Sequence, residues 1–115
     1  MGIRVSCHCG KIAFGLDDEP TQAIECNCSI CRKRGAILAA APADKLRLET
    51  PREAMSTYAF NTHKISHHFC TTCGCGPFSE GVGRDGQPMV MVNLRCADDF
   101  DLSAVEVMPF DGAKL

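Results

Sequence analysis

The sequence contains no tryptophan, one tyrosine and six phenylalanines among its 115 residues. A core built mainly from large aromatic side chains is therefore excluded, and other groups must contribute to stability. No apolar run reaches the roughly 18 residues of a membrane-spanning helix, so the sequence predicts none. The first ten residues lack the apolar stretch of a secretion signal. We therefore expect a protein of the reducing cytoplasm, where structural disulfides are rare.

An excess of basic residues is also missing, because 12 Lys and Arg stand against 14 Asp and Glu, for a formal net charge of −2. Proteins that neutralise nucleic-acid phosphates usually have a strong basic excess, so the charge balance argues against a nucleic-acid partner. Hydrophobic residues make up 45% and charged residues 23% of the chain, which is typical of a folded protein. The length predicts a single domain spanning residues 1–115.

Helical periodicity is scarce, whereas short segments alternate between apolar and polar residues as half-buried β-strands do. The alternating or β-branched segments are residues 3–6, 11–16, 46–48, 58–60, 89–94 and 105–107. The alanine-rich stretch 36–43 is short and contains Pro42, which counts against a stable helix there. The sequence therefore predicts a mostly β fold.

Cysteine is the residue that this chain has in abundance, with nine copies. Seven of them lie in three motifs: Cys7-His8-Cys9-Gly10, Cys26-Asn27-Cys28-Ser29-Ile30-Cys31 and Cys70-Thr71-Thr72-Cys73-Gly74; Cys75 and Cys96 are left over. Disulfides explain this pattern poorly, because the count is odd and cysteines one residue apart on a strand rarely reach bonding geometry. Zinc explains it better, because a tight turn lets two thiolates approach one ion at about 2.3 Å.

The glycines that follow two of these motifs, Gly10 and Gly74, have a use in a zinc site. A glycine relaxes the backbone so that amide N–H groups can point at the sulfurs. The seven cysteines divide as four plus three. A metal shared by the first and last motifs would close a loop of some 60 residues and stabilise the fold.

The remaining triplet of cysteines would leave one position of a tetrahedral zinc ion open, as in catalytic-type sites. Cys75, Cys96 or a histidine could instead complete the set, and spacing alone leaves this open. Three thiolates around one Zn²⁺ have a net charge of −1, which makes the metal a poor activator of water. Such an ion still accepts a soft thiolate, so the triplet favours thiol chemistry over hydrolysis.

Several neighbouring residues are candidates for further roles. Arg32, Lys33 and Arg34 follow the triplet and form either a solvated basic turn or a patch that binds the carboxylates of a thiol peptide such as glutathione. His67 and His68 are adjacent on a predicted strand, so at most one of them should reach a site. We expect His8 to point away from the metal, His63 to lie at the surface, and Cys96 to be a small buried hydrophobe.

Taken together, the motifs resemble those of the glutathione-dependent formaldehyde-activating enzyme family, also called the centromere protein V domain family. The resembling segments are Cys7–Gly10, Cys26–Gly35, Phe69–Gly74, Val92–Cys96 and Phe110–Gly112. The resemblance spans Cys7 to Gly112, nearly the whole chain. It departs at Cys75, which stands where a small residue that does not bind metal is expected.

The resemblance implies a mostly β fold shared with a small zinc-binding chaperone of Rab GTPases. It also implies two Zn²⁺ ions per chain: a structural ion on Cys7, Cys9, Cys70 and Cys73, and a catalytic-type ion on Cys26, Cys28 and Cys31. The reaction it implies joins formaldehyde to glutathione and gives S-hydroxymethylglutathione. This reaction is classed with those of carbon–sulfur lyases.

Two functions of different kinds are therefore compatible with these motifs. The first is an enzyme that acts on a glutathione-like thiol and on formaldehyde or a related small electrophile. The second is a non-catalytic binding module scaffolded by zinc, in which a fourth ligand closes the triplet site and the basic turn contacts an acidic partner. A redox or metal-buffering protein is a third and weaker hypothesis.

Overall fold

The computed structural model describes residues 2–60, 64–83 and 85–112. His63, which we expected at the surface, lies outside them. Within the described ranges the chain forms eleven strands, one α-helix and four short 3₁₀ turns, so the prediction of a mostly β fold is confirmed. None of the described helices is long and apolar enough to span a membrane.

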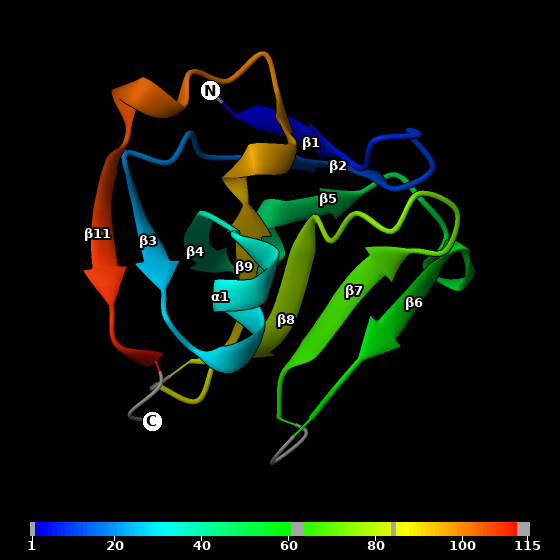
Figure 1. Cartoon of the computed structure of the whole chain (residues 1–115). Helices are drawn as coiled ribbons and strands as arrows, with labels where there is room; N and C mark the ends of the chain where they lie inside the picture. The colour runs from blue at the N-terminus through cyan, green and yellow to red at the C-terminus, as the bar shows by residue number, and fades with distance from the viewer. Residues whose placement is uncertain (1, 61–63, 84, 113–115) are drawn as a thin grey trace.

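The elements run in chain order as follows: β1 (Ile3–Ser6), β2 (Ala13–Leu16), β3 (Gln22–Cys26), α1 (Ser29–Arg34), β4 (Leu38–Pro42), η1 (Ala43–Lys45), β5 (Leu46–Leu48), η2 (Arg52–Ala54), β6 (Met55–Tyr58), β7 (Ser66–Cys70), β8 (Phe78–Val82), β9 (Pro88–Asn93), η3 (Leu94–Cys96), β10 (Ala97–Asp98), η4 (Leu102–Ala104) and β11 (Glu106–Phe110). The strands form two sheets (Figure 1). The smaller sheet has the order β10-β1-β2-β5, and the larger has the order β11-β3-β4-β9-β8-β7-β6. Neighbouring strands are antiparallel except β11, which runs parallel to β3.

The hydrophobic core lies between the two sheets and follows the predicted alternation. Val5 of β1 is fully buried while Arg4 beside it is exposed. Phe14 of β2 meets Phe78 of β8 edge to face, with ring centroids 5.0 Å apart. Burial of each such side chain contributes about 1.5–3 kcal/mol, so this small core joins the sheets without any tryptophan.

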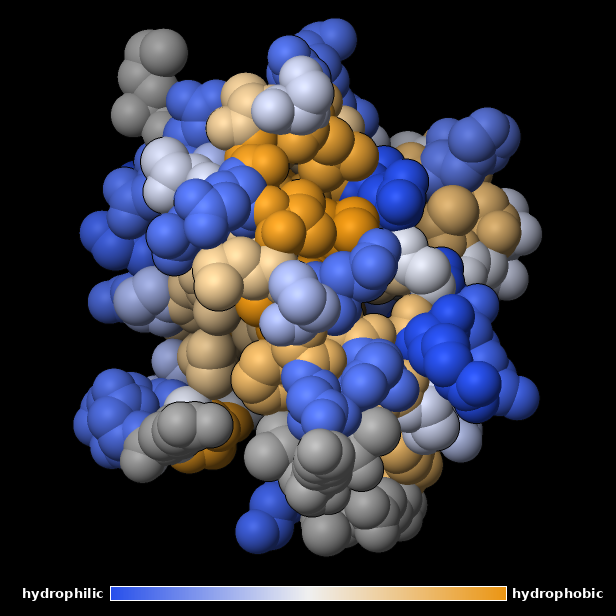
Figure 2. Space-filling view, turned by 60° about the vertical axis from the view of Figure 1, so that its left-hand side comes forward, coloured by the Kyte–Doolittle hydropathy of each residue, from blue (hydrophilic) through white to orange (hydrophobic). Residues whose placement is uncertain are grey.

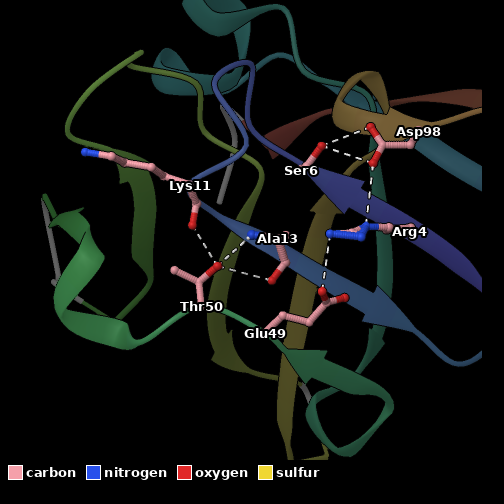
Figure 3. Close-up of polar contacts among 7 residues, drawn as sticks. All are labelled: Arg4, Ser6, Lys11, Ala13, Glu49, Thr50 and Asp98. Atoms are coloured by element: carbon pink, nitrogen blue, oxygen red, sulfur yellow. Dashed lines mark hydrogen bonds and ion pairs between the residues drawn. The ribbon is translucent and has the colours of Figure 1, made fainter.

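Polar contacts fasten the β1–β2 hairpin, which holds the first cysteine motif (Figure 3). The hydroxyl of the buried Thr50 accepts a hydrogen bond of 2.8 Å from the N–H of Ala13 and donates one of 2.8 Å to the carbonyl of Lys11. On the same sheet, Arg4 pairs with Glu49 at 3.2 Å. At the other end of the loop, Ser6 Oγ donates a hydrogen bond of 2.9 Å to Asp98 Oδ1, so the loop between β1 and β2 is held on both sides and Cys7 follows the fixed Ser6.

Two segments fold differently from what local pattern indicates. The alanine-rich stretch contains strand β4, because small side chains let it lie between β3 and β9, with Ala39 buried opposite Val92. No helical periodicity of apolar residues predicts helix α1. It has six residues, none of them buried, and no side chain bonds to its first N–H groups. Its position comes from its tertiary surroundings.

Helix α1 lies over the face of the larger sheet that is turned away from the core (Figure 1). Ile30 and Cys31 of this helix share a cavity with Ser79 of β8 and Met91 of β9. The β11 edge of the same sheet comes forward in Figure 2, where apolar residues gather at the centre of the face. The last residue of β11, Phe110, pairs with Cys26, so this edge borders the cysteine triplet.

Candidate functional site

Four of the cysteines come together between the two sheets. The sulfurs of Cys7, Cys9, Cys70 and Cys73 all lie within 4.8 Å of one another. Cys9 Sγ is 3.6 Å from Cys7 Sγ and 3.5 Å from Cys70 Sγ. Sulfurs around one tetrahedral zinc ion are about 3.8 Å apart when each bond is about 2.3 Å, so this donor set fits zinc. Because Cys7 follows β1 and Cys70 ends β7, an ion here would link the two sheets.

Backbone N–H groups surround these sulfurs. Ile12 donates to Cys7 Sγ at 3.3 Å and Thr72 donates to Cys70 Sγ at 3.3 Å. Gly10 and Gly74 have φ values of +85° and +81°. L side chains rarely adopt such φ values, so the expected role of these two glycines is confirmed. The two motifs thus form similar turns around one cluster, which we name the four-cysteine cluster.

The same N–H groups set the protonation of the thiols. Hydrogen bonds from the N–H of Cys75 and of Cys9 lower the pKa of Cys73 to about 5. At Cys9 the N–H of Lys11 favours the thiolate, but desolvation and the neighbouring sulfurs together raise the pKa to about 11. The cluster is therefore partly ionised near neutral pH, and metal binding must displace the remaining protons.

The other three motif cysteines form a second cluster, the cysteine triplet, at the start of α1. Cys26 ends β3, Cys28 immediately precedes α1, and Cys31 lies within the helix. Their sulfurs also lie within 4.8 Å of one another, and the N–H of Cys28 donates to Cys26 Sγ at 3.4 Å. All three residues are half-buried. The triplet is thus more open to solvent than Cys7 and Cys70 are.

No further cysteine, histidine, aspartate or glutamate joins the triplet among the residues that the structure describes. The alternative in which Cys75, Cys96 or a described histidine completes this site is therefore not supported. Cys96 instead lies near Cys75 and the four-cysteine cluster. Burial, and next the negative charge of the Cys75 thiolate and of the cluster thiolates, raise the pKa of Cys96 to about 11. It is half-buried and packs against the core, close to the buried position expected for it.

Protonation within the triplet is uneven. Burial raises the pKa of Cys31 to about 12, with further contributions from Cys28 and Cys26. Burial also acts to raise the pKa of Cys28, but hydrogen bonds from the N–H of Cys31 and from neighbouring sulfurs outweigh it, so this pKa is lowered. All nine cysteines lie in the described ranges and all are free thiols. None of them is therefore held in a disulfide, so each can lose its proton and bind a metal ion as the thiolate.

A large hollow of about 590 Å³ opens beside the triplet. Cys26, Cys31, Arg32 and the end of β11 with Phe110 and Asp111 contribute to its wall. The residues of the basic turn are all exposed but face different ways. Arg32 lines this large hollow and Arg34 lines a smaller cavity, whereas Lys33 lines neither. The turn thus presents one cation on each side of Cys31 and a third to solvent.

Gly112 is a site residue whose contact the sequence did not reveal. A Cβ atom at this position would overlap Cys26 Sγ and lie 3.3 Å from Cys28 Cβ. The backbone after β11 therefore lies directly against the triplet. The only signal in the sequence is the Phe110-Asp111-Gly112 segment, which spacing did not connect to residues more than 80 positions earlier.

The two adjacent histidines point to opposite faces of the larger sheet. His68 is buried, with Nδ1 2.9 Å from Thr57 Oγ1 and Nε2 2.6 Å from Glu80 Oε1, so its polar atoms are occupied within the fold. His67 lines the small cavity together with Cys31 and Arg34. His8 is exposed and belongs to neither cluster. Of the adjacent pair, only His67 lies beside the triplet.

The chain is similar both to a protein family and to a solved structure. A family model described as glutathione-dependent formaldehyde-activating enzyme matches residues 2–110. Among solved structures, the chain is similar to a Rhodobacter sphaeroides protein whose crystal structure was a structural genomics target. The two are 31% identical with a TM-score of 0.79, over 94% of this chain and 100% of that one. Both cysteine clusters lie within the residues matched by the family model.

Proposed function

This chain belongs to the glutathione-dependent formaldehyde-activating enzyme family, and on that premise we propose that it is an S-hydroxymethylglutathione synthase-like enzyme. The substrates are a glutathione-like thiol and formaldehyde or a related small electrophile. The family membership supports a glutathione- and formaldehyde-related activity. The assignment to the carbon–sulfur lyases and the roles of individual residues are part of this proposal.

We further propose that the protein binds two zinc ions. The four-cysteine cluster would hold a structural ion, because its four sulfurs have tetrahedral spacing and two of them are deeply buried. Cys26, Cys28 and Cys31 would hold a catalytic-type ion with one position left for a substrate sulfur. When bound there, zinc would lower the pKa of the substrate thiol.

The residues around the triplet bind and orient the thiol. The hollow of about 590 Å³ is within the range of roughly 300–1,000 Å³ that small-molecule sites have. Arg32 in its wall supplies a cation for one of the carboxylates of a glutathione-like peptide. When the sulfur is oriented toward a bound one-carbon electrophile, a reaction between two molecules in water becomes a reaction within one complex, which lowers its entropic barrier.

The observation that supports this proposal best is that the triplet has three cysteine ligands and no fourth protein ligand among the described residues. Three thiols converge beside a large hollow, and no fourth protein ligand joins them in the described part of the chain. A closed site with four protein ligands, which the binding-module hypothesis requires, would have no position for a substrate sulfur.

The test is a titration of the zinc-loaded protein with glutathione, followed by calorimetry and zinc-edge X-ray absorption. S-methylglutathione is the matched control, since it has the same carboxylates but no free thiol. We expect one additional sulfur ligand per chain with glutathione and none with the control. An unchanged zinc ligand set at saturating glutathione would contradict the enzyme and favour the binding module.

Three sequence-based expectations accompany this proposal and stay predictions. They are the kinship with the fold of the zinc-binding Rab GTPase chaperone, the single domain over residues 1–115, and the cytoplasmic location. The last is consistent with glutathione as a substrate, because free thiols persist in a reducing compartment.

A further inference from the structure

Cys31 lines two hollows that therefore adjoin at this residue, and we propose that they divide the two substrates between them. The large hollow takes the thiol, and the small cavity takes the one-carbon carbonyl compound, with His67 and Arg34 as the residues that contact its oxygen. This inference rests on the proposed function and deepens it, because it assigns a second subsite and two further catalytic residues.

The two hollows differ in size in the way that the two substrates do. The small cavity has a volume of about 30 Å³, against about 590 Å³ for the large one. A cavity needs about 10–15 Å³ on this measure to hold one water molecule. The small cavity therefore has room for about two or three heavy atoms, enough for formaldehyde, and excludes a peptide.

The guanidinium of Arg34 lies close to the backbone of Gly76. A Cβ atom added to Gly76 would lie 2.7 Å from Arg34 Nη1 and 3.3 Å from Arg34 Cζ. The guanidinium therefore extends from the end of α1 over the backbone between β7 and β8. No described carboxylate forms an ion pair with Arg34. Its N–H donors are thus not held by an acidic partner.

His67 reaches the same cavity from β7. Its ring is half-buried and stacks on Phe60 with centroids 5.7 Å apart, which fixes its orientation. Burial, then the positive charge of Arg34 and the neighbouring His68, lower the pKa of His67. The imidazole is therefore neutral at pH 7, with one N–H to donate and one nitrogen to accept a proton. Ser79 and Asn93 complete the polar part of the lining.

The step that these residues assist is an addition without change of redox state. The thiolate sulfur forms a C–S bond to the carbonyl carbon as the C=O π bond breaks, and that electron pair goes to the oxygen. Arg34 donates a hydrogen bond to the developing oxyanion, where a preorganised donor has its largest effect. His67 takes a proton from water on one ring nitrogen as its other nitrogen passes a proton to the oxygen, so the ring stays neutral. This proton balances the one that the thiol lost to solvent.

The test compares His67→Gln, Arg34→Gln and Gly76→Ala with the matched controls Arg47→Gln and Gly15→Ala. Gly76→Ala keeps the arginine but pushes its guanidinium aside, whereas a Cβ at Gly15 meets nothing closer than 4.0 Å. The readouts are the NMR exchange rate between glutathione and its hydroxymethyl adduct above the uncatalysed rate, the glutathione Kd by calorimetry, and the zinc content. Formamide, an unreactive one-carbon carbonyl compound, probes the cavity through the ring signals of His67.

We expect each of the three variants to lower the catalysed exchange rate at least tenfold, with glutathione Kd within twofold of wild type and zinc content unchanged. The two controls should behave like wild type, and formamide should shift the His67 signals of the wild-type protein. Wild-type exchange rates in His67→Gln and Arg34→Gln would overturn the inference while leaving the proposed function intact. Loss of glutathione binding in these variants would also overturn it. A wild-type protein that neither binds glutathione nor catalyses exchange would overturn the proposed function itself.

Discussion

The two cysteine clusters use the same chemical group in opposite structural settings. In the four-cysteine cluster, Cys7 and Cys70 are 3% and 1% exposed and connect the two sheets, whereas Cys73 is half-buried and Cys9 is exposed. In the triplet, all three cysteines come from one short segment and are half-buried, and Cys26 and Cys31 line a hollow of about 590 Å³. On the proposed assignment, chain connectivity and access to the hollow, rather than ligand type, would separate a stabilising site from a reactive one.

Loop length explains why the two sites should contribute so differently to stability. Cys9 and Cys70 are 61 positions apart, so a bond network through them closes a long loop and restricts the unfolded chain. The triplet lies within residues 26–31 and closes almost no loop. An ion at the four-cysteine cluster should therefore supply folding free energy, and an ion at the triplet should supply mainly chemistry.

The largest expected effect comes from Cys70→Ser. Loss of a buried ligand that joins the sheets should lower the free energy of unfolding by more than about 4 kcal/mol. Chemical denaturation followed by far-UV circular dichroism measures this. Cys75→Ser is the matched control, with an expected loss of less than about 1.5 kcal/mol. Equal losses in the two variants would show that the four-cysteine cluster does not stabilise the fold.

The second effect is the reverse pattern in Cys28→Ser. This variant should lose one zinc ion per chain and at least about 100-fold of the catalysed exchange rate, because a ligand of the reactive site is gone. Its unfolding free energy should change by less than about 1.5 kcal/mol. Metal content by mass spectrometry and denaturation curves check both parts. Global unfolding of Cys28→Ser would remove the distinction between the clusters.

A smaller effect is expected from Gly112→Ala, which changes no ligand. The added methyl group would collide with Cys26 Sγ and shift the triplet. The zinc affinity of the triplet should fall about tenfold, as for other changes next to metal ligands. Competition with a fluorescent chelator measures it, and Gly15→Ala is the control. An unchanged affinity would mean that the segment after β11 does not shape this site.

The smallest effect concerns the polar network beside β7, the strand that ends at Cys70. Hydrogen bonding to Arg52, followed by that to His68, lowers the pKa of Glu80 below its ordinary 4.5. The charged form therefore stabilises the fold above about pH 4.5, and this contribution is lost as pH falls through the lowered value. Glu80→Gln should cost about 1 kcal/mol at pH 7.

The same substitution has a pH signature that urea denaturation can check. The stability difference between wild type and Glu80→Gln should be present at pH 7 and should shrink below about pH 4.5. Metal loss at low pH affects both proteins and cancels in the difference. A difference that grows toward acid pH would contradict the sign of this shift.

Local spacing was sufficient for some features of the fold and the site. The four-plus-three grouping and the turn role of Gly10 and Gly74 follow from motifs of a few residues, because turns are local structures. The alternation around Val5 and Phe14 likewise predicts strands, since a strand with one buried face repeats every two residues. These features depend on interactions between residues that are close in the chain.

Other features needed the folded chain, because their residues are distant in sequence. Helix α1 has no buried residue and no capping side chain, so no periodicity could predict it. The contact of Gly112 with Cys26 arises from the parallel pairing of β11 with β3, and the convergence of His67 with Arg34 arises from the packing of α1 on the larger sheet. Motif chemistry could predict which groups cluster in a way that could hold a metal ion, whereas strand pairing across the sheets placed the triplet beside a large and a small hollow.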